Sequence, residues 1–489
     1  MVSGMPALDA LRDRLAELAD LASLQRLAGW DQRTMMPPGG APARAQQSAT
    51  LERLVHDRAT ADDIGAWLEE IDGGDDGLGE VDADLVRLAR RDWERVRRIP
   101  RELASDLALA SAEGQGVWQS ARAANDFAAF APALRRNVDL ARAYAACFDD
   151  VEHPYDALLA DYDFGLTAAR VREIFGPLAE ALSALAAEAA ERPEVPALTV
   201  PIDAQRAAVD AILARLGVTP DSWRVDLSPH PFTSWVGTQD TRITTRYLPD
   251  AQIESILAAI HEFGHGLYER QIPPELARTN LGRGTSMSAH ESQSKLWENH
   301  VGRHPAFAPV IASDLEAGGF TVAPDALHRA ITAVKPSLIR VSADPLTYPL
   351  HIVLRFDLEV ALIEGSLEVP DLPAAWNDGM RRLLGVEVPD DARGVLQDTH
   401  WSAGAFGYFP SYALGCLIAA QLWERLEADA GAQDEALRAG DVGAIRAWLA
   451  EHVHRYGRRL DTEPLVEAAT GRGIDPEPFL RHVTPYARA

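Results

Sequence analysis

The segment AQIESILAAIHEFGHGLYERQ (251–271) carries the strongest structural and chemical signal in the chain. Its apolar residues recur at helical spacing, so the segment predicts an α-helix. On a helix, His261 and His265 lie four positions apart on one face, where both imidazoles can reach the same ion. Glu262 is excluded from that face but lies beside the ion, where a general base is needed. The segment therefore predicts a metal-binding catalytic helix.

A catalytic zinc ion needs a third protein ligand and an open position for water. Glu269 follows His261 on the same face, but eight residues rise about 12 Å along a helix, whereas metal–ligand bonds are about 2 Å long. An intact helix therefore excludes Glu269. The segment TSMSAHESQSKLWENH (285–300) predicts a second helix, with Ser286 or Ser288 as its N-cap. Spacing leaves three residues of this helix open as the third ligand: His290, Glu291 and Glu298.

Most of the remaining chain also predicts helices. Apolar residues recur at helical spacing in further stretches, namely 5–29, 44–72, 81–99, 102–147, 167–192, 204–217, 289–301, 346–365 and 411–431. The exception is 222–248, where Thr, Val, Ile, Trp and Tyr alternate with polar residues on either side of Gly237. That pattern predicts a short hairpin or small sheet. The expected fold class is mainly α, with one large helical body and a small β-sheet near the metal site.

Composition excludes several classes of partner. The 489 residues include 47 Lys+Arg and 73 Asp+Glu, which give a formal net charge of −26. We expect no nucleic-acid partner and no membrane partner, because phosphates and anionic lipids bind basic faces and no window is apolar enough to span a bilayer. Charges near the N-terminus argue against a signal peptide. Cys147 and Cys416 cannot form a disulfide framework, which favours a cytoplasmic location.

Short motifs follow one another along the chain: WDQRTMMPPGGAPARAQQ (30–47), HPF (230–232), DTRIT (240–244), HEFGH (261–265), HESQ (290–293), IRVSAD (339–344), GVLQDTHW (394–401) and GYFPSYALG (407–415). In this order they resemble the carboxypeptidase Taq family of metallocarboxypeptidases. The resemblance spans nearly the whole chain.

The resemblance implies a helical, gluzincin-like peptidase fold with a deep active-site cleft and a small sheet beside the metal. It implies a homodimer that releases single amino acids from peptides with a free C-terminus, with broad specificity. It assigns Glu291 as the third ligand with His261 and His265, and places His290 behind the ligands or facing the substrate. A His₂Glu set suits zinc, although Co²⁺ or Mn²⁺ can occupy such a site.

The expected domain organisation follows from the same motifs. We expect a single catalytic domain over residues 1–489, since motifs from residue 30 to residue 415 converge on one cleft. An N-terminal helical part, about 1–200, would cover the cleft. The metal-binding core would occupy about 220–415.

Other residues complete the expected mechanism. Glu262 would take a proton from the attacking water and return it to the leaving amine. The oxyanion needs a hydrogen-bond donor, and related helical peptidases draw such donors from a downstream segment. Here that segment holds His400, Tyr408 and Tyr412. The two tyrosines are four residues apart and would share a helical face, although Pro410 disturbs the local geometry.

An exopeptidase must also bind a free α-carboxylate, which the planar fork of an arginine does bidentately. Arg340 is the first candidate, followed by Arg355 and Arg242. As alternatives, Arg355 would pair with Glu359 one helical turn on, and Arg242 with Asp240 in the sheet.

Several other polar residues have expected places. Candidate partners for the outer N–H groups of the ligating histidines are His230, Asp240, Asp344 and Asp398. We expect His452 and His454 on a solvated helix face, and Cys147 and Cys416 as buried packing residues.

Two other functions remain open. A zinc-dependent oligopeptidase or endopeptidase uses the same His₂Glu chemistry, but the IRVSAD and GVLQDTHW matches favour the exopeptidase. A non-catalytic helical binding protein is disfavoured, because a vestigial site should have lost at least one of its ligands or its general base.

Overall fold

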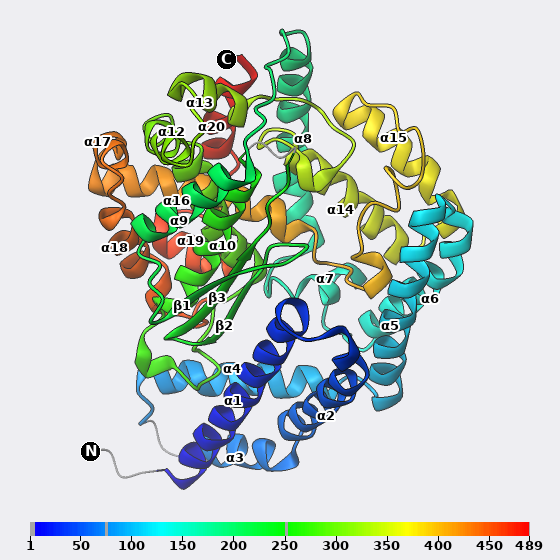
Figure 1. Cartoon of the computed structure of the whole chain (residues 1–489). Coiled ribbons are helices and arrows are strands. Elements are labelled where there is room, and N and C mark those ends of the chain that lie inside the picture. The colour runs from blue at the N-terminus through cyan, green and yellow to red at the C-terminus, as the bar shows by residue number, and fades with distance from the viewer. Residues whose placement is uncertain (1–4, 74–76, 250–252, 489) are drawn as a thin grey trace.

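The computed structural model describes residues 5–73, 77–249 and 253–488, and the helical character of these residues confirms the predicted mainly-α fold class (Figure 1). The first part of the chain contains α1 (Pro6–Thr34), α2 (Ala41–Ala59), α3 (Asp62–Asp72), α4 (Glu80–Arg97), α5 (Arg101–Ala124), α6 (Phe127–Ala145), α7 (Pro154–Leu159), α8 (Ala168–Ala190) and α9 (Ile202–Leu216). The middle contains β1 (Trp223–Leu227), β2 (Thr233–Gly237), β3 (Asp240–Thr245), α10 (Glu254–Arg270), α11 (Met287–Lys295), α12 (Ala308–Ala317), α13 (Pro324–Thr332), α14 (Tyr348–Glu364) and α15 (Leu372–Leu384). The last part contains α16 (Pro410–Ala430), α17 (Asp434–Arg438), α18 (Gly443–His452), α19 (Thr462–Thr470) and α20 (Glu477–Arg488).

Two of the predicted helices are each divided in two. The stretch 102–147 forms α5 and α6, because Asn125 takes a left-handed conformation with φ 54° and the Asp126 side chain caps α6. The stretch 44–72 forms α2 and α3. In both cases a single turn residue or a short turn interrupts a pattern that is helical on both sides.

The two helices predicted to hold the metal are α10 and α11. α10 begins at Glu254, and the first two residues of the predicted segment, 251 and 252, lie outside the described residues. The hydroxyl of Ser286 accepts a hydrogen bond from the first turn of α11, so Ser286 is the N-cap. α11 continues into a π-helical turn, Leu296–Gly302, a rare wider helix that occurs often at functional sites.

The predicted small sheet forms between α9 and α10. Its strand order is β1-β3-β2, with β1 parallel and β2 antiparallel to β3. β2 and β3 are a hairpin whose register shifts next to Gly237. The prediction of a hairpin or small sheet in 222–248 is therefore confirmed.

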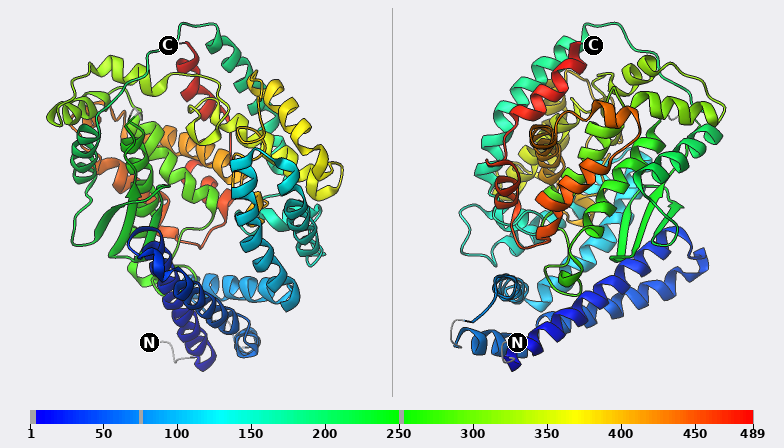
Figure 2. Two further views of the ribbon diagram at one scale, coloured as in Figure 1. Left: turned by 45° about the vertical axis from the view of Figure 1, so that its right-hand side comes forward. Right: turned by 90° about the vertical axis from the view of Figure 1, so that its left-hand side faces the viewer.

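The elements around α10 pack in a continuous series. α1 packs on β2, the β2–β3 hairpin packs on α10, and α10 packs on α11. α11 in turn packs on α16, and α16 on α14. Figures 1 and 2 show α1–α3 at one end of the molecule and α20 at the other. The packing gathers helices from the beginning, middle and end of the sequence around the metal-binding segment.

Two hydrophobic clusters hold these elements together. The larger runs from Ala121 to Ala487 and includes the buried faces of α10, α11, α14 and α16. The smaller joins α1, α3 and α4 to the loop between α10 and α11, through Ile272, Leu276 and Leu281. The N-terminal helices are therefore fastened to the loop that leads into the second metal-binding helix.

The division into a cover of about 1–200 and a core of about 220–415 stays a prediction, as does the deep cleft. Among the helices of the described residues, none is long and apolar enough to cross a membrane.

The close approach of α11 to its neighbours depends on two glycines. A Cβ at Gly264 would lie 2.6 Å from the carbonyl oxygen of Gln293 and 2.8 Å from Cα of Ser294. A Cβ at Gly415, in α16, would lie 2.6 Å from Cβ of Glu291. Backbone atoms cannot move aside unless a whole helix shifts. The two glycines therefore set the spacing at which Glu291 faces α10.

Replacing Gly264 by alanine should lower the free energy of unfolding by about 1–3 kcal/mol, because the added methyl group overpacks the contact between α10 and α11. The matched control is Gly116→Ala in α5, where an added Cβ meets no atom within 4 Å. The control should leave stability unchanged or raise it by up to about 1 kcal/mol, since alanine favours a helix. Denaturant unfolding followed by circular dichroism measures both. A Gly264→Ala protein as stable as the control would contradict the close packing.

Candidate metal centre

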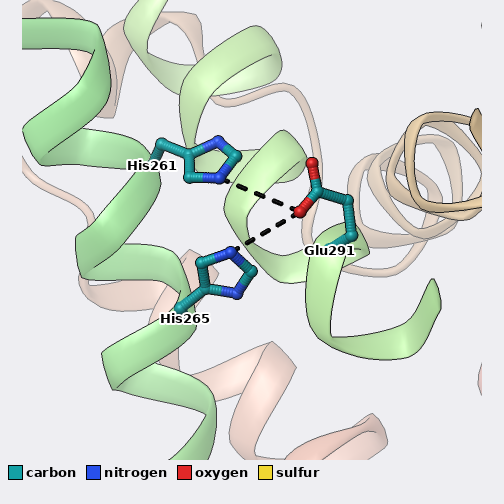
Figure 3. A group of neighbouring side chains, drawn as sticks. All are labelled: His261, His265 and Glu291. Atoms are coloured by element: carbon teal, nitrogen blue, oxygen red, sulfur yellow. Dashed lines mark ion pairs between the residues drawn. The ribbon is translucent and has the colours of Figure 1, made fainter. Parts of the chain in front are cut away.

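Two histidines of α10 and a glutamate of α11 point toward one another (Figure 3). Nε2 of His265 lies 3.5 Å, and Nε2 of His261 lies 3.9 Å, from the same oxygen, Oε2 of Glu291. One ligand atom from each residue falls within 4.8 Å of the other two. The side chains of His261 and His265 are 19% and 16% exposed, so the cluster is accessible from solvent.

A buried carboxylate holds the outer nitrogen of His261. Nδ1 of His261 lies 2.9 Å from Oε2 of Glu298, which belongs to the π-helical turn. An ionised carboxylate only accepts hydrogen bonds. Nδ1 of His261 therefore carries a hydrogen and donates a hydrogen bond to Glu298. A neutral His261 therefore keeps its lone pair on Nε2, the atom that faces Glu291.

A longer chain of hydrogen bonds holds His265. Its Nδ1 lies 2.7 Å from Nδ1 of His290, and Nε2 of His290 lies 2.9 Å from Oε1 of Glu269. Glu269 accepts the Nε2 proton, so a neutral His290 has its lone pair on Nδ1 and accepts from His265. Nε2 of His265 is then free to bind an ion. Glu269, excluded as a ligand by the helical rise, lies at the far end of this chain, and His290 lies behind the ligands.

The charges of the cluster favour a bound cation. Burial lowers the pKa of His265 to about 4, so its imidazole is neutral at pH 7. Burial opposes ionisation of Glu291, but His261 and Lys295 outweigh it and help to lower the pKa of the carboxyl to about 2. Burial also lowers the pKa of His261, but Glu291 and Glu298 reverse the shift. Two imidazole nitrogens and one carboxylate oxygen are a common donor set for catalytic zinc, so these residues fit a divalent ion.

Lys295 lies between the carboxylates of Glu291 and Glu298 and the ring of Tyr348. Its Nζ is 2.9 Å from Oε2 of Glu298 and 3.9 Å from Oε1 of Glu291. The same atom lies 4.8 Å from the ring centre of Tyr348. Glu298, which spacing left open as a ligand, thus binds both Lys295 and His261 and lies behind the ion site.

Glu262 lies beside the ligands and is buried. Its Oε2 accepts a hydrogen bond from Oγ1 of Thr233 at 2.6 Å, and burial raises the pKa of the carboxyl. Thr233 belongs to β2, so the sheet reaches the catalytic helix through this contact. Sequence reasoning missed Thr233, because its position depends on how β2 packs on α10.

The three residues expected to bind the oxyanion lie together. Nε2 of His400 lies 3.2 Å from the hydroxyl of Tyr412, and the rings of Tyr408 and Tyr412 meet edge to face at 5.1 Å. Tyr408 precedes α16, so the two tyrosines do not share a helical face as their spacing suggested. Burial raises the pKa of both tyrosines, which keeps their hydroxyls protonated. Gly415, one turn after Tyr412, packs on α11 and so brings this group toward the ligands.

Asp398 holds two of the candidate substrate-binding arginines. Its Oδ1 accepts from Nε and Nη2 of Arg340 at 3.1 and 2.8 Å, and its Oδ2 accepts from Nε of Arg355 at 2.7 Å. Burial opposes the charge of Asp398, but the two arginines outweigh it and lower the pKa of the carboxyl. Arg355 is fully buried and also donates to the backbone of His351 and the side chain of Gln397.

Arg340 contacts the tyrosines Tyr348 and Tyr412. Its Nη1 lies 3.3 Å from the hydroxyl of Tyr348, and its guanidinium carbon lies 4.9 Å from the ring centre of Tyr412. Asp398 and Tyr348 together use three of its N–H groups. Since a guanidinium has five N–H groups, one hydrogen remains on each terminal nitrogen.

Other predicted residues make structural contacts. Nε and Nη2 of Arg242 each lie 2.8 Å from the carboxylate of Asp240, which is the alternative pairing expected for Arg242. Asp344 accepts backbone hydrogen bonds just before α14, and His230 is exposed. The partners of His261 and His265 are therefore Glu298 and His290 rather than these residues.

Glu359 anchors the segment that carries the expected oxyanion donors. Its Oε1 accepts from Nε1 of Trp401 at 2.7 Å. Its Oε2 accepts from the hydroxyl of Tyr155 at 2.7 Å and from the backbone of Gly407 at 3.0 Å. Burial raises the pKa of its carboxyl to about 7. The alternative pairing of Arg355 with Glu359 is not formed, because Arg355 binds Asp398 instead.

Two further expectations concerned solvent exposure. The solvated position predicted for His454 is wrong, because its Nε2 lies buried, 2.9 Å from Oε1 of Gln293. His452 is partly exposed. Cys416 is buried as predicted, whereas Cys147 is partly exposed.

Glu298→Ala should lower metal affinity about 10- to 100-fold, because His261 loses the partner that fixes its tautomer and orientation. The matched control is Glu316→Ala in α12, where the glutamate is exposed and the affinity should not change. Competition with a chromophoric chelator measures both affinities. Equal affinity of Glu298→Ala and the wild type would contradict this role.

Comparison with known proteins identifies relatives along nearly the whole chain. A model of the carboxypeptidase Taq (M32) metallopeptidase family matches residues 10–486. Thermostable carboxypeptidase 1 of Thermus thermophilus is 40% identical over 487 residues, which cover 96% of this chain and 95% of that protein. Carboxypeptidase 1 of Bacillus subtilis is 34% identical over 479 residues, which cover 95% of this chain and 94% of that protein.

Solved structures have the same fold. Metallocarboxypeptidase 1 of Trypanosoma cruzi matches with a TM-score of 0.95 and 34% identity over 99% of this chain and 100% of that chain. A carboxypeptidase of Pyrococcus furiosus matches with a TM-score of 0.95 and 32% identity over 100% of both chains. These matches confirm the family, the fold class and the metallocarboxypeptidase activity expected from the motifs. The chain belongs to the carboxypeptidase Taq (M32) family of metallopeptidases.

Proposed function

We propose that this chain is a zinc-dependent carboxypeptidase of broad specificity and that His261, His265 and Glu291 bind the ion. The observation that carries the proposal is the tautomer of the two histidines. Each Nδ1 donates to a fixed acceptor, so each Nε2 lone pair is directed toward Oε2 of Glu291. Three protein ligands leave one position for water, as in catalytic rather than structural zinc sites. Co²⁺ and Mn²⁺ accept the same donors.

Glu262 is the proposed general base and general acid. A divalent ion at this site supplies Lewis acidity and lowers the pKa of water. Glu262 accepts a proton from the attacking water and passes it to the leaving amine. Its hydrogen bond with Thr233, at 2.6 Å, holds the carboxylate in one position for both transfers.

His400, Tyr408 and Tyr412 are the proposed donors to the oxyanion. Support comes from their contact with one another and from the raised pKa of both tyrosines, which preserves the O–H group as a donor. The hydrogen bond between His400 and Tyr412 orients that hydroxyl. A donor held in place before the reaction stabilises developing negative charge at little reorganisation cost.

Arg340 is the proposed site for the substrate α-carboxylate. The two N–H groups that remain on its terminal nitrogens suit the two oxygens of a carboxylate. Arg355 remains a second candidate, but its side chain is fully buried, which favours a supporting role through Asp398. Arg242, the third candidate, is engaged with Asp240.

The function is tested with a peptide, its C-terminally amidated twin and a chelator control. The metal-loaded protein should release single amino acids stepwise from the free acid, and chelation should abolish the release. Mass spectrometry identifies the products. Internal cuts in both peptides would instead support an endopeptidase, and cleavage that survives chelation would contradict the metal-dependent mechanism.

Arg340→Ala should lower kcat/KM for the free-acid peptide by about 100-fold, because a charged partner of the carboxylate is lost. The loss should appear mainly in KM, and the residual activity on the amidated peptide should change much less. Arg381→Ala is the control, since Arg381 is exposed and pairs with Asp378. Equal losses on both peptides would contradict the assignment.

We also propose a homodimer, which rests on the family resemblance, and a cytoplasmic location, which rests on the cysteine content. Sedimentation equilibrium distinguishes the dimer from a monomer. A monomer at all concentrations would contradict the proposal.

A further inference from the structure

Arg283 lies in the loop between α10 and α11, next to the hydrogen bonds that hold His265. The backbone N–H of Gly284 donates to Oε1 of Glu269 at 2.9 Å. The same oxygen accepts from His290, which in turn contacts His265. A Cβ at Gly284 would lie only 3.0 Å from Cδ2 of His290, so the loop runs directly against that ring. The loop that carries Arg283 therefore forms the wall on the His265 side of the centre.

The charge of Arg283 is not neutralised by a direct contact. Its side chain is exposed, and no ion pair or hydrogen bond holds it within the described part of the chain. Two carboxylates, Asp92 and Glu269, exert an electrostatic attraction on it. Both are already engaged, because Asp92 binds Arg458 through two hydrogen bonds and Glu269 accepts from His290.

Arg283 is partly desolvated although solvent reaches it. The positive charge of Arg458 and partial desolvation lower its pKa to about 10, so the side chain remains a cation at neutral pH. A partly desolvated cation attracts an anion more strongly than a fully hydrated one does.

Arg26 of α1 extends this basic surface. Its guanidinium carbon lies 5.2 Å from the ring centre of Trp235, and the Trp235 ring stacks on His290 at 5.2 Å. Arg26 donates to the backbone oxygen of Trp235 and to the hydroxyl of Ser23. Within the described ranges, no carboxylate forms an ion pair with it. We refer to Arg26 and Arg283 together as the basic wall.

The basic wall and Arg340 flank the ligands from different sides. Arg340 contacts Tyr348, whose ring lies 4.8 Å from Nζ of Lys295, and Lys295 is on the Glu298 side of the cluster. The basic wall reaches the cluster through His290. A peptide with its α-carboxylate on Arg340 and its scissile carbonyl at the ligands therefore extends its upstream residues toward the basic wall.

We propose that Arg283, supported by Arg26, forms a subsite for the side-chain carboxylate of an acidic residue upstream of the cleaved bond. This proposal rests on the proposed carboxypeptidase function and adds a substrate class to it, peptides with Asp or Glu before the released residue. A guanidinium with free N–H groups binds a carboxylate bidentately. The net charge of −26 repels acidic peptides at long range, so local cations are needed to accept them.

The test uses pairs of peptides that differ at one position, where one peptide has Glu and the other has Gln. Three separate pairs place this difference at the second, third and fourth residue from the C-terminus. The metal-loaded wild type should favour Glu in one pair by about tenfold in kcat/KM, as expected for one charged hydrogen bond, and added salt should reduce the preference. Arg283→Gln should bring the ratio to about one. The control Arg278→Gln, in the same loop but paired with Asp20, should keep the ratio.

Two results would overturn the subsite and leave the carboxypeptidase function intact. One is equal cleavage of every Glu and Gln pair by the wild type, and the other is a preference that survives Arg283→Gln. A third result also overturns it: if Arg283→Gln removes discrimination between free and amidated C-termini, the α-carboxylate itself lies at Arg283.

Binding is measured separately from turnover, by fluorescence anisotropy of labelled Glu and Gln peptides on the metal-loaded Glu262→Gln protein. The Glu peptide should bind about tenfold more tightly than its Gln twin, and adding Arg283→Gln should remove the difference. If neither peptide is cleaved by the wild type but this difference is observed, the carboxypeptidase function fails and the subsite stands.

Discussion

The hydrogen bonds at the Nδ1 atoms of His261 and His265 constrain the rest of the candidate metal centre. An imidazole whose Nδ1–H is held by an acceptor can offer only Nε2 to an ion. His261 is held by Glu298 of the π-helical turn, and His265 is held through His290 by Glu269 of its own helix. The three donor atoms therefore come together only when α10, α11 and the π-helical turn lie at a fixed distance from one another. Gly264 permits that spacing, since any side chain there meets the backbone of α11.

The largely buried charges around this centre are paired, whereas the exposed charge of Arg283 beside it is not. Unpaired buried charges are costly, which accounts for the cations beside Glu298 and Asp398. Within the described residues, Arg283 has no such partner, and it lies near the like charge of Arg458. An acidic chain with a local basic wall can therefore repel anions in general and still accept an acidic peptide at one place.

The sequence predicts the parts of this centre that depend on local geometry. Helical periodicity locates α10, and a four-residue spacing brings His261 and His265 together whatever the rest of the fold. Helical periodicity and residue spacing do not predict contacts between elements that are distant in the sequence. Thr233, for example, contacts Glu262 only because β2 packs on α10. Single residues that end helices, such as Asn125, and short helices such as α17 carry too weak a periodic signal. Family motifs supplied the remaining candidates, but only packing shows which of the candidate arginines lies against Tyr348 and Tyr412.

The central claim is that the two histidines bind one divalent ion through Nε2, together with Glu291. Anomalous diffraction at the zinc absorption edge, from crystals of the zinc-loaded protein, tests it directly. The account predicts one strong peak about 2.0–2.2 Å from Nε2 of His261, Nε2 of His265 and a carboxylate oxygen of Glu291, with both Nδ1 contacts retained. A peak bonded to Nδ1 of either histidine, or one that replaces Glu291 by Glu298, would contradict it.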